Sequence, residues 1–243
     1  MRVAILYSGG KDSTFAIDYA KEKGWEVVYL LSVKPTRTDC YLFHYATVEH
    51  TTELAKILNI PHILITCEVA DPKQEAELVK TVVGQNIEEN PIDAMVLGGT
   101  GLQETQLKLV RDALFDLGVE VFACHKGRDH EEILNEMIDK GYEIIITQFA
   151  TEGLDEKWLG KRLDENSVKE LKKLSDRYGF HIGGEGGPFD TLVLDGPIFD
   201  RKLNILESEV VLEDKFSGHL IIKKLEVLHK PMKTKTYTSL YRV

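Results

Sequence analysis

Short apolar runs alternate along the chain with longer stretches in which apolar residues recur every three or four positions. Runs of the first kind are typical of buried strands, and the second spacing is typical of helices with one buried face. The pattern predicts strands at residues 2–7, 27–31, 63–67, 94–97, 119–123 and 143–147, and helices at residues 14–23, 47–58, 72–89, 102–117, 129–140 and 167–178. This alternation predicts an α/β fold with a doubly wound, mainly parallel sheet of the Rossmann-like type.

The starts of three helices are marked by polar residues at fixed spacing. Asp71 is followed by Pro72 and Gln74, Asp129 stands three residues before Glu132, and Ser167 stands three residues before Glu170. A side chain three positions into a helix can return a hydrogen bond to the capping residue, and proline suits the first helical position. We therefore expect helices to begin at these three places.

The pattern changes after Gly179. Residues 191–194, 205–212 and 220–228 are predicted strands with no helix between them. We therefore expect a doubly wound domain at residues 1–150 and a smaller α+β, substrate-binding domain at residues 151–229, with a boundary near residues 149–153. Residues 230–243 carry basic residues and little apolar periodicity, which predicts a mobile tail.

The sequence between the first predicted strand and the first predicted helix is Ser8-Gly9-Gly10-Lys11-Asp12-Ser13. Glycines at a strand-to-helix turn let the backbone approach a ligand closely, and the free N–H groups at the start of a helix favour phosphate. The Walker A pattern does not fit, because Asp12 follows Gly10-Lys11 and no glycine stands five residues before Gly10. The run therefore indicates a phosphate-binding loop of a different type.

Three other segments follow predicted strands of the same sheet. Ligands of open parallel sheets bind beyond the carboxyl ends of the strands, where the strand order reverses. Ser32 follows the second strand, Gly98-Gly99 follows the fourth, and residues 124–126 follow the fifth. We expect Ser32 and the two glycines near a nucleotide. Residues 124–126 could serve a substrate, although Cys124 and His125 also suit simple packing.

The composition narrows the class of protein. The chain has 243 residues, of which 43% are hydrophobic and 29% charged, as is typical of a soluble globular enzyme. A net charge of -10 argues against strong nucleic-acid binding. No apolar run approaches the roughly 20 residues of a membrane span, so no membrane contact is expected. Three widely spaced cysteines without a Cys-x-x-Cys pair favour a reduced, cytoplasmic setting.

Two motifs in the second half connect the chain to a known family. Residues 183–197 surround Glu185 with glycines before a predicted strand, and residues 153–160 read Gly-Leu-Asp-Glu-Lys-Trp-Leu-Gly. Residues 8–13 match the Ser-Gly-Gly-x-Asp-Ser loop of the ATP pyrophosphatases, the PP-loop branch of the adenine nucleotide alpha hydrolase superfamily. In their order along the chain, the three motifs resemble those of the diphthine:ammonia ligase, or diphthamide synthase, family over residues 1–228.

The resemblance implies a reaction and its participants. Members of the family activate the carboxylate of diphthine on elongation factor 2 with ATP, release pyrophosphate, and let ammonia displace AMP to form the amide. Magnesium is implied because it neutralises the phosphates and stabilises the leaving pyrophosphate. A homodimer is a further expectation from the family.

The resemblance also implies roles for particular residues. Lys11, Asp12 and Ser13 are expected to act in catalysis, with Asp12 also the metal ligand. Residues expected to bind the nucleotide are Tyr7, Ser8, Gly9, Gly10, Lys11, Asp12, Ser13, Ser32, Gly98 and Gly99. Residues expected to bind the acceptor are His44, Glu185, Gly186, Gly187, Asp190 and Thr191.

Several positions depart from the family pattern, and two other functions stay open. Pro188 replaces a glutamate, residues 98–107 lack the usual tyrosine and arginine, and His125 replaces a tryptophan. The ATP loop is intact, so ATP chemistry is predicted more firmly than the acceptor. One alternative is a sensor that binds ATP or AMP without turnover. The other is a tRNA thiolase using Cys124 or Cys40, which the acidic charge and the unpaired cysteines disfavour.

Overall fold

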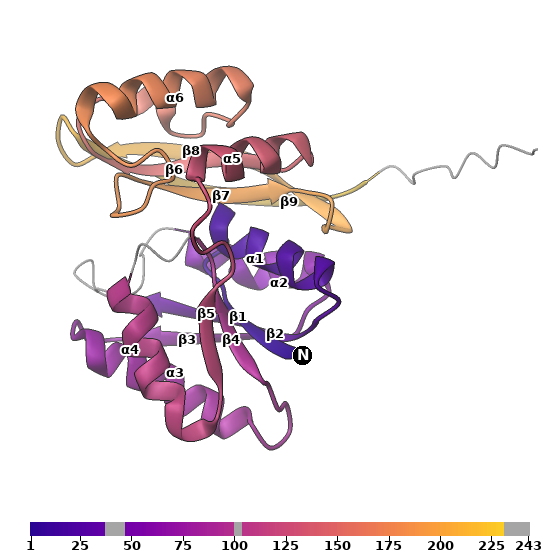
Figure 1. Cartoon of the computed structure of the whole chain (residues 1–243). Coiled ribbons are helices and arrows are strands. Elements are labelled where there is room, and N and C mark those ends of the chain that lie inside the picture. The colour runs from indigo at the N-terminus through magenta and orange to yellow at the C-terminus, as the bar shows by residue number, and fades with distance from the viewer. Residues whose placement is uncertain (37–46, 100–103, 231–243) are drawn as a thin grey trace, which may run out of the picture.

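The computed structural model describes residues 1–36, 47–99 and 104–230. These residues form two sheets that lie in separate layers, with helices between them and on their outer sides (Figure 1). The first sheet has five strands and the second has four. His44 and Cys40, and the predicted tail beyond residue 230, lie outside the described residues.

The first sheet is entirely parallel and has the order β3-β2-β1-β4-β5. Its strands are β1 (Arg2–Leu6), β2 (Glu26–Pro35), β3 (His62–Cys67), β4 (Ala94–Leu97) and β5 (Glu120–Ala123). Its helices are α1 (Lys11–Glu22), α2 (Thr51–Leu58), α3 (Pro72–Asn86) and α4 (Glu104–Leu114), with short 3-10 turns η1 (Val48–His50) and η2 (Phe115–Leu117). The predicted doubly wound α/β fold is confirmed.

Helices cover both faces of the parallel sheet. Val3 and Ile5 of β1 pack with α1 and α2, whereas Ala4 between them packs with α3 and α4. Successive side chains of a strand point to opposite faces, so a strand covered on both sides must be apolar at every position. This explains the continuous apolar runs that predicted these strands.

The second sheet is antiparallel and has the order β7-β6-β9-β8. Its strands are β6 (Glu143–Ala150), β7 (Phe189–Asp195), β8 (Arg201–Leu212) and β9 (Ser217–His229). Helices α5 (His130–Asp139) and α6 (Glu165–Tyr178) lie on its side away from the first sheet (Figure 1), and a 3-10 turn η3 (Glu156–Trp158) precedes α6.

Strand β6 does not belong to the parallel sheet in which the sequence pattern had placed it. The chain passes to the second sheet between β5 and β6, well before the expected boundary near residues 149–153. An apolar run predicts burial but not the neighbouring strand, which depends on contacts distant in sequence. A register shift between Ile146 and Gln148 leaves Thr147 without a partner in the ladder to β7, as in a β-bulge.

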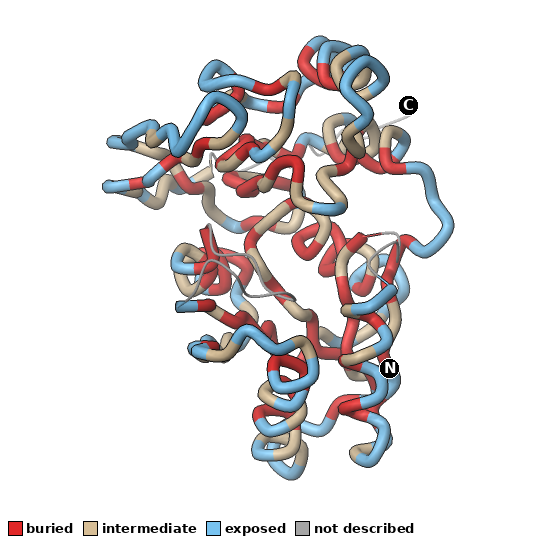
Figure 2. Tube along the Cα trace, turned by 90° about the vertical axis from the view of Figure 1, so that its left-hand side faces the viewer, coloured by how far each residue is buried: buried red, intermediate tan, exposed pale blue. Residues whose placement is uncertain are grey.

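Helices α1 and α2 form the layer between the two sheets (Figure 1). Phe15, Ile17 and Leu54 are fully buried in a core that joins both sheets. At the rim, the Lys140 ammonium lies 2.9 Å from Asp18 and 2.6 Å from Glu22, and so links the end of α5 to α1. Buried positions run through both sheets and through this middle layer, and exposed ones occupy the outer loops (Figure 2).

Several boundaries differ from those that the pattern predicted. Helix α1 begins at Lys11 rather than at residue 14, and β2 continues to Pro35 rather than ending at residue 31. Asp71 and Asp129 cap their helices as expected. The cap of α6 is Asp164, and Ser167 occupies the third helical position instead of the first capping position. The reciprocal bonds of this capping box are 2.6 and 2.7 Å long.

We predict that Asp164→Ala lowers the free energy of unfolding by about 1 kcal/mol, because α6 loses the carboxylate that accepts the Ser167 N–H. The midpoint of urea unfolding measures the effect. Glu165→Ala, which changes the next and exposed position, is the matched control. Equal midpoints for the two variants would contradict a stabilising role of the cap.

Candidate functional site

A pocket lies at the carboxyl ends of β1 and β4, where the strand order of the parallel sheet reverses. Chain segments that are distant in sequence line it together. They are the loop after β1 with the start of α1, the glycines after β4, the turn at residues 183–185, and the start of β7. Open parallel sheets bind their ligands at this topological position. This makes the pocket the candidate active site.

The loop at residues 8–13 makes a tight turn from β1 into α1. Gly9 has a φ of 81°, a conformation that favours glycine, and a Cβ there would lie 3.0 Å from Leu54 Cδ1. The hydroxyls of Ser8 and Ser13 lie 3.1 Å apart, and the Ser8 N–H donates to Ser13 Oγ at 3.2 Å. These contacts tie the loop to the first turn of the helix, as a ligand-binding backbone requires.

The first turn of α1 offers N–H groups to the pocket. The Lys11 N–H donates to Thr191 Oγ1 of β7 at 3.1 Å. Asp12 and Ser13 also line the pocket, and as the second and third residues of α1 they have no helical carbonyl one turn earlier to accept from their N–H groups. Unpaired N–H groups and the positive end of the helix dipole together favour an anion. The arrangement can therefore bind a phosphate group.

The side chain of Lys11 is almost fully buried at the edge of this turn. Its Nζ lies 2.5 Å from Asp12 Oδ2 and 2.5 Å from the carbonyl oxygen of Gly183. The contact with Gly183 joins residues 172 positions apart in the sequence. Lys11 thus connects the loop of the first sheet to the glycine-rich turn that precedes β7, and places a positive charge beside the free N–H groups.

The two glycines after β4 lie close to the first turn of α1 and to Glu185. A Cβ on Gly98 would stand 2.5 Å from the backbone carbon of Asp12, closer than any side chain permits. Gly99 has a φ of 82°, and a Cβ there would lie 3.1 Å from Glu185 Oε1. The sequence-predicted glycines are therefore next to both the start of α1 and Glu185.

The glycine-rich turn brings an acidic side chain to the pocket. Gly184, Gly186 and Gly187 all have positive φ, and the Gly187 N–H donates to the Gly184 carbonyl at 3.1 Å. Glu185 at the tip lines the pocket, and its Oε1 lies 2.9 Å from Nε2 of His130. Gly186 and Gly187 shape the turn but do not line the pocket.

Two other predicted residues line the pocket from β7. Asp190 and Thr191 are adjacent on this strand, and both reach the pocket wall. The pocket also includes Thr47, Val48 and Gln106, which the sequence alone did not single out. No local motif marks these three, because only the folded chain brings them to the strand ends.

Ser32 does not line the pocket. It lies within β2 rather than after it and is fully buried. Its hydroxyl donates to the Tyr7 carbonyl at 2.6 Å and lies 2.8 Å from His62 Nε2. Ser32 therefore supports the backbone at Tyr7, directly before the loop at residues 8–13. Tyr7 itself lines the pocket.

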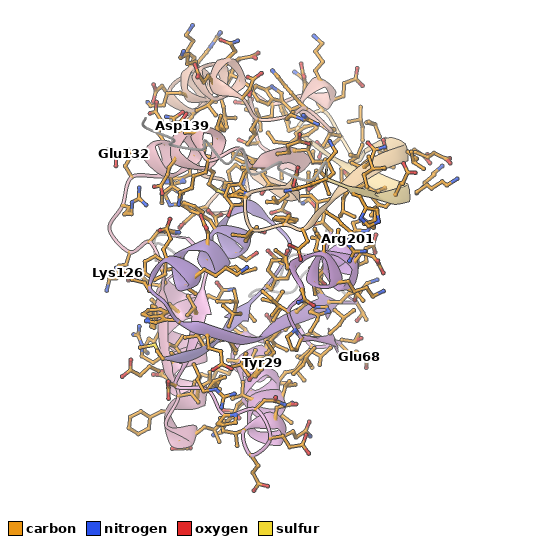
Figure 3. The ribbon with its side chains drawn as sticks, turned by 90° about the vertical axis from the view of Figure 1, so that its right-hand side faces the viewer. Tyr29, Glu68, Lys126, Glu132, Asp139 and Arg201 are labelled. Atoms are coloured by element: carbon orange, nitrogen blue, oxygen red, sulfur yellow. The ribbon has the colours of Figure 1, made fainter. Side chains whose placement is uncertain are left out.

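The segment after β5 is packed rather than open to substrate. The His125 ring stacks on Phe15 with centroids 4.7 Å apart, and burial lowers the pKa of His125 to about 4. Burial raises the pKa of the Cys124 thiol well above its usual range, which opposes a reactive thiolate. Lys126 is exposed and lies on the outside of the molecule (Figure 3).

The residues present suit one mode of magnesium binding. Among the described residues, no three His, Cys, Asp or Glu side chains group as a metal site. Magnesium in nucleotide sites needs only one or two carboxylates, because phosphates and water complete its coordination. Asp12, whose side chain is 29% exposed and lines the pocket, offers such a carboxylate.

Comparison with known proteins assigns the family. Residues 1–119 match the diphthamide synthase N-terminal domain, and residues 129–228 match the diphthamide synthase C-terminal domain. The chain therefore belongs to the diphthamide synthase family. The two matches are separated by residues 120–128, which contain β5 and the segment where the chain leaves the parallel sheet.

Curated relatives of the same family align with nearly the whole of this chain. The chain is 30% identical to diphthine–ammonia ligase of Homo sapiens, covering 100% of this chain and 97% of the human protein. It is 31% identical to diphthine–ammonia ligase of Danio rerio, covering 95% and 98%. It is 29% identical to the protein of the same name in Schizosaccharomyces pombe, covering 95% of this chain but 40% of that protein.

One solved structure shows a slight similarity to this chain. It is described as a predicted subunit of tRNA methyltransferase from Methanocaldococcus jannaschii, and it is 14% identical with a TM-score of 0.39. The alignment covers 81% of this chain and 99% of that chain. This likeness is too slight to bear on the fold or the function.

Within the described part of the chain, no helix has the length and apolar character needed to cross a membrane.

We predict that Gly98→Ala lowers the free energy of unfolding by about 1–3 kcal/mol, because the new methyl group forces the first turn of α1 to move. Chemical denaturation measures the loss. Gly84→Ala is the control, since its Cβ would meet nothing closer than 3.8 Å in helix α3 and should not destabilise the protein. Equal stability of the two variants would show that the close approach at Gly98 is not needed.

Buried His125 predicts a loss of stability in weak acid. Its folded-state pKa of about 4 lies below the usual 6.5, so below pH 6.5 the unfolded chain binds a proton that the folded chain does not. The free energy of unfolding therefore falls as the pH drops from 6.5 to 4, by about 3 kcal/mol at most from this residue.

We expect His125→Phe, which keeps an aromatic ring on Phe15, to flatten this part of the stability profile. Urea unfolding at a series of pH values from 7 to 4 measures the slope. His229→Gln, which removes an exposed histidine, should leave the slope unchanged. An unchanged slope in His125→Phe would place the acid sensitivity elsewhere.

Proposed function

We propose that this protein is an ATP-dependent, amide-forming ligase that adenylylates a carboxylate and transfers ammonia to it. The observation that carries the proposal is the complete Ser8–Ser13 loop, which lies at the start of α1 and in a pocket at the reversal of strand order. Membership of the diphthamide synthase family and relatives named diphthine–ammonia ligase support the same reaction.

The triphosphate of ATP would lie on the first turn of α1. The N–H groups of Asp12 and Ser13 supply hydrogen bonds, and Lys11 supplies charge to the pyrophosphate that departs. Val33, Val48 and Leu97 give the pocket an apolar wall that suits the adenine ring. Gly98 and Gly99 let the nucleotide approach the backbone beside this wall.

Asp12 is the proposed magnesium ligand. The bound ion would neutralise phosphate charge and stabilise pyrophosphate. Lys11 contacts the same carboxylate at 2.5 Å, and thereby orients it toward the pocket that it lines. The proposed coordination leaves the remaining positions to phosphate oxygens and water, as magnesium prefers.

The reaction needs no nucleophile from the protein. The acceptor carboxylate attacks the alpha phosphorus, the bond to pyrophosphate breaks, and an acyl adenylate forms. Ammonia then attacks the acyl carbon and AMP leaves. The pocket contributes by aligning the reacting groups and stabilising developing charge. The packing of Cys124, which raises the pKa of its thiol, agrees with this route and opposes sulfur transfer.

The proposed acceptor is diphthine on elongation factor 2. Asp190 brings a carboxylate to the pocket and Phe189 brings an aromatic side chain, and the two suit the quaternary ammonium group of diphthine. We further propose that the protein works in the cytoplasm and forms a homodimer. His44, which the family resemblance assigns to the acceptor, lies outside the described residues.

We predict that Lys11→Ala lowers the rate of AMP formation about 100-fold or more, because the departing pyrophosphate loses its cationic partner. The assay contains ATP, magnesium, ammonium and elongation factor 2 carrying unamidated diphthine, and it measures AMP and pyrophosphate. Lys21→Ala, an exposed position in the last turn of the same helix, is the control.

Full activity of Lys11→Ala would exclude the proposed role of the lysine. If the unaltered protein binds ATP but forms no AMP with any carboxylate acceptor, the protein is a nucleotide sensor instead. The two outcomes can be told apart, because calorimetry measures ATP binding in the absence of acceptor and the AMP assay is run afterwards with acceptor present.

A further inference from the structure

The pair formed by Glu185 and His130 lies in the same pocket as the loop at residues 8–13. The Glu185 Oε1 and His130 Nε2 atoms lie 2.9 Å apart, and the two side chains are 10% and 5% exposed. A carboxylate repels the phosphate groups of a nucleotide. Its place in this pocket therefore indicates a cationic ligand.

His130 is held firmly in one orientation. It is the first residue of α5, directly after the capping residue Asp129. The His181 ring meets it edge-on with centroids 4.5 Å apart, and a Cβ on Gly183 would overlap its Nδ1 at 2.1 Å. Any residue other than glycine at position 183 would displace the His130 ring. The glycine-rich turn therefore fixes the position of this histidine.

The Glu185 carboxylate is equally confined. Its backbone belongs to the glycine-rich turn, which the Lys11 ammonium holds through the Gly183 carbonyl. Its Oε1 lies close to Gly99, since a Cβ added to this glycine would be only 3.1 Å from the oxygen. A buried carboxylate fixed by three segments is preorganised for a ligand of definite size.

Three cations could occupy the pocket during the proposed reaction. Magnesium prefers an octahedron of oxygen atoms, whereas one oxygen of Glu185 is already engaged by the His130 imidazole at 2.9 Å. A quaternary ammonium has no N–H to donate and gains most from aromatic faces. An ammonium ion has four N–H groups, and ionised carboxylates are the strongest acceptors for them.

We propose that Glu185 binds the ammonium ion and accepts a proton from it, and that His130 is the positioning residue that orients the carboxylate. The inference rests on the proposed function. One N–H bond of ammonium breaks, its proton passes to Glu185, and the freed electron pair attacks the acyl carbon. The bond from that carbon to the AMP oxygen then breaks, and the second proton leaves the new amide nitrogen to water.

The neighbouring charged groups agree with this assignment. Lys11 and Asp12 face the phosphate side of the pocket and are paired with each other. Asp190 lines the pocket from β7, and His181 lies behind His130. Glu185 is the acidic side chain that combines a histidine partner, contact with the second glycine loop and a place in the pocket wall.

The test compares two nucleophiles in Glu185→Gln. Ammonium must lose a proton before it attacks, whereas hydroxylamine is a weaker base and is largely unprotonated at neutral pH. We expect the ammonium-dependent rate to fall about 100-fold, since a general base is removed, and hydroxamate formation to change less than about threefold. The matched control is Glu132→Gln, which changes an exposed glutamate of α5 (Figure 3).

His130→Gln tests the positioning role, because the glutamine amide can still donate to the carboxylate from a side chain of similar reach that is less rigid. We expect the KM for ammonium to rise about tenfold while the KM for ATP stays near that of the unaltered protein. Thermal unfolding of each variant checks that it is folded. If His130→Gln does not fold, the Glu185→Gln comparison still decides the proposal.

The outcomes separate this proposal from the proposed function. Equal loss with both nucleophiles, or a raised KM for the acceptor with an unchanged KM for ammonium, would overturn the ammonium site. Acceptor-dependent exchange of pyrophosphate into ATP needs no ammonia. If the unaltered protein lacks this exchange, the ligase function fails, and the ammonium site with it.

Discussion

The first turn of α1 is held between two sheets, and the pocket depends on that constraint. Its Lys11 N–H is bound by Thr191 of β7, and the Gly9 carbonyl accepts from Val193 of the same strand at 3.1 Å. On its other side the turn lies against the backbone of Gly98. Both sheets therefore position the loop directly, so its N–H groups keep a fixed direction. A loop supported from one side only would have to be ordered by its ligand, at a cost in entropy.

The same constraint explains how an acidic protein can offer an anion site. The chain carries a net charge of -10, which repels phosphate at long range. Inside the pocket, fixed N–H groups and the buried Lys11 act at contact distance, where the surrounding apolar layers reduce screening by water. Local geometry therefore outweighs the overall charge. The Glu185 carboxylate lies close by, but its histidine partner compensates part of its burial.

The sequence predicted the features whose causes are local. The apolar runs of β1 to β5 reflect burial on both faces, and residues 8–13 carry their own turn chemistry, so the strands and the strand-to-helix turn were predicted correctly. Ser32 was placed after a strand because the apolar run ends at Leu31, yet the sheet continues through polar positions that remain hydrogen-bonded. The sheet to which β6 belongs depends on partners distant in sequence. His130 escaped notice for the same reason, since its partner Glu185 is 55 residues away.

The bulge at Thr147 shows which change of length this strand can absorb. It sets Ile146 opposite Thr191 and Gln148 opposite Asp190, so two residues of β6 that are two positions apart face consecutive residues of β7. Residues that pair directly point to the same side of a sheet, so the extra residue turns Ile146 and Gln148 to opposite sides. Deletion of Thr147 would make these two residues direct neighbours, which also point to opposite sides. The strand can therefore lose this one residue and its local bend while Phe149 still faces the core.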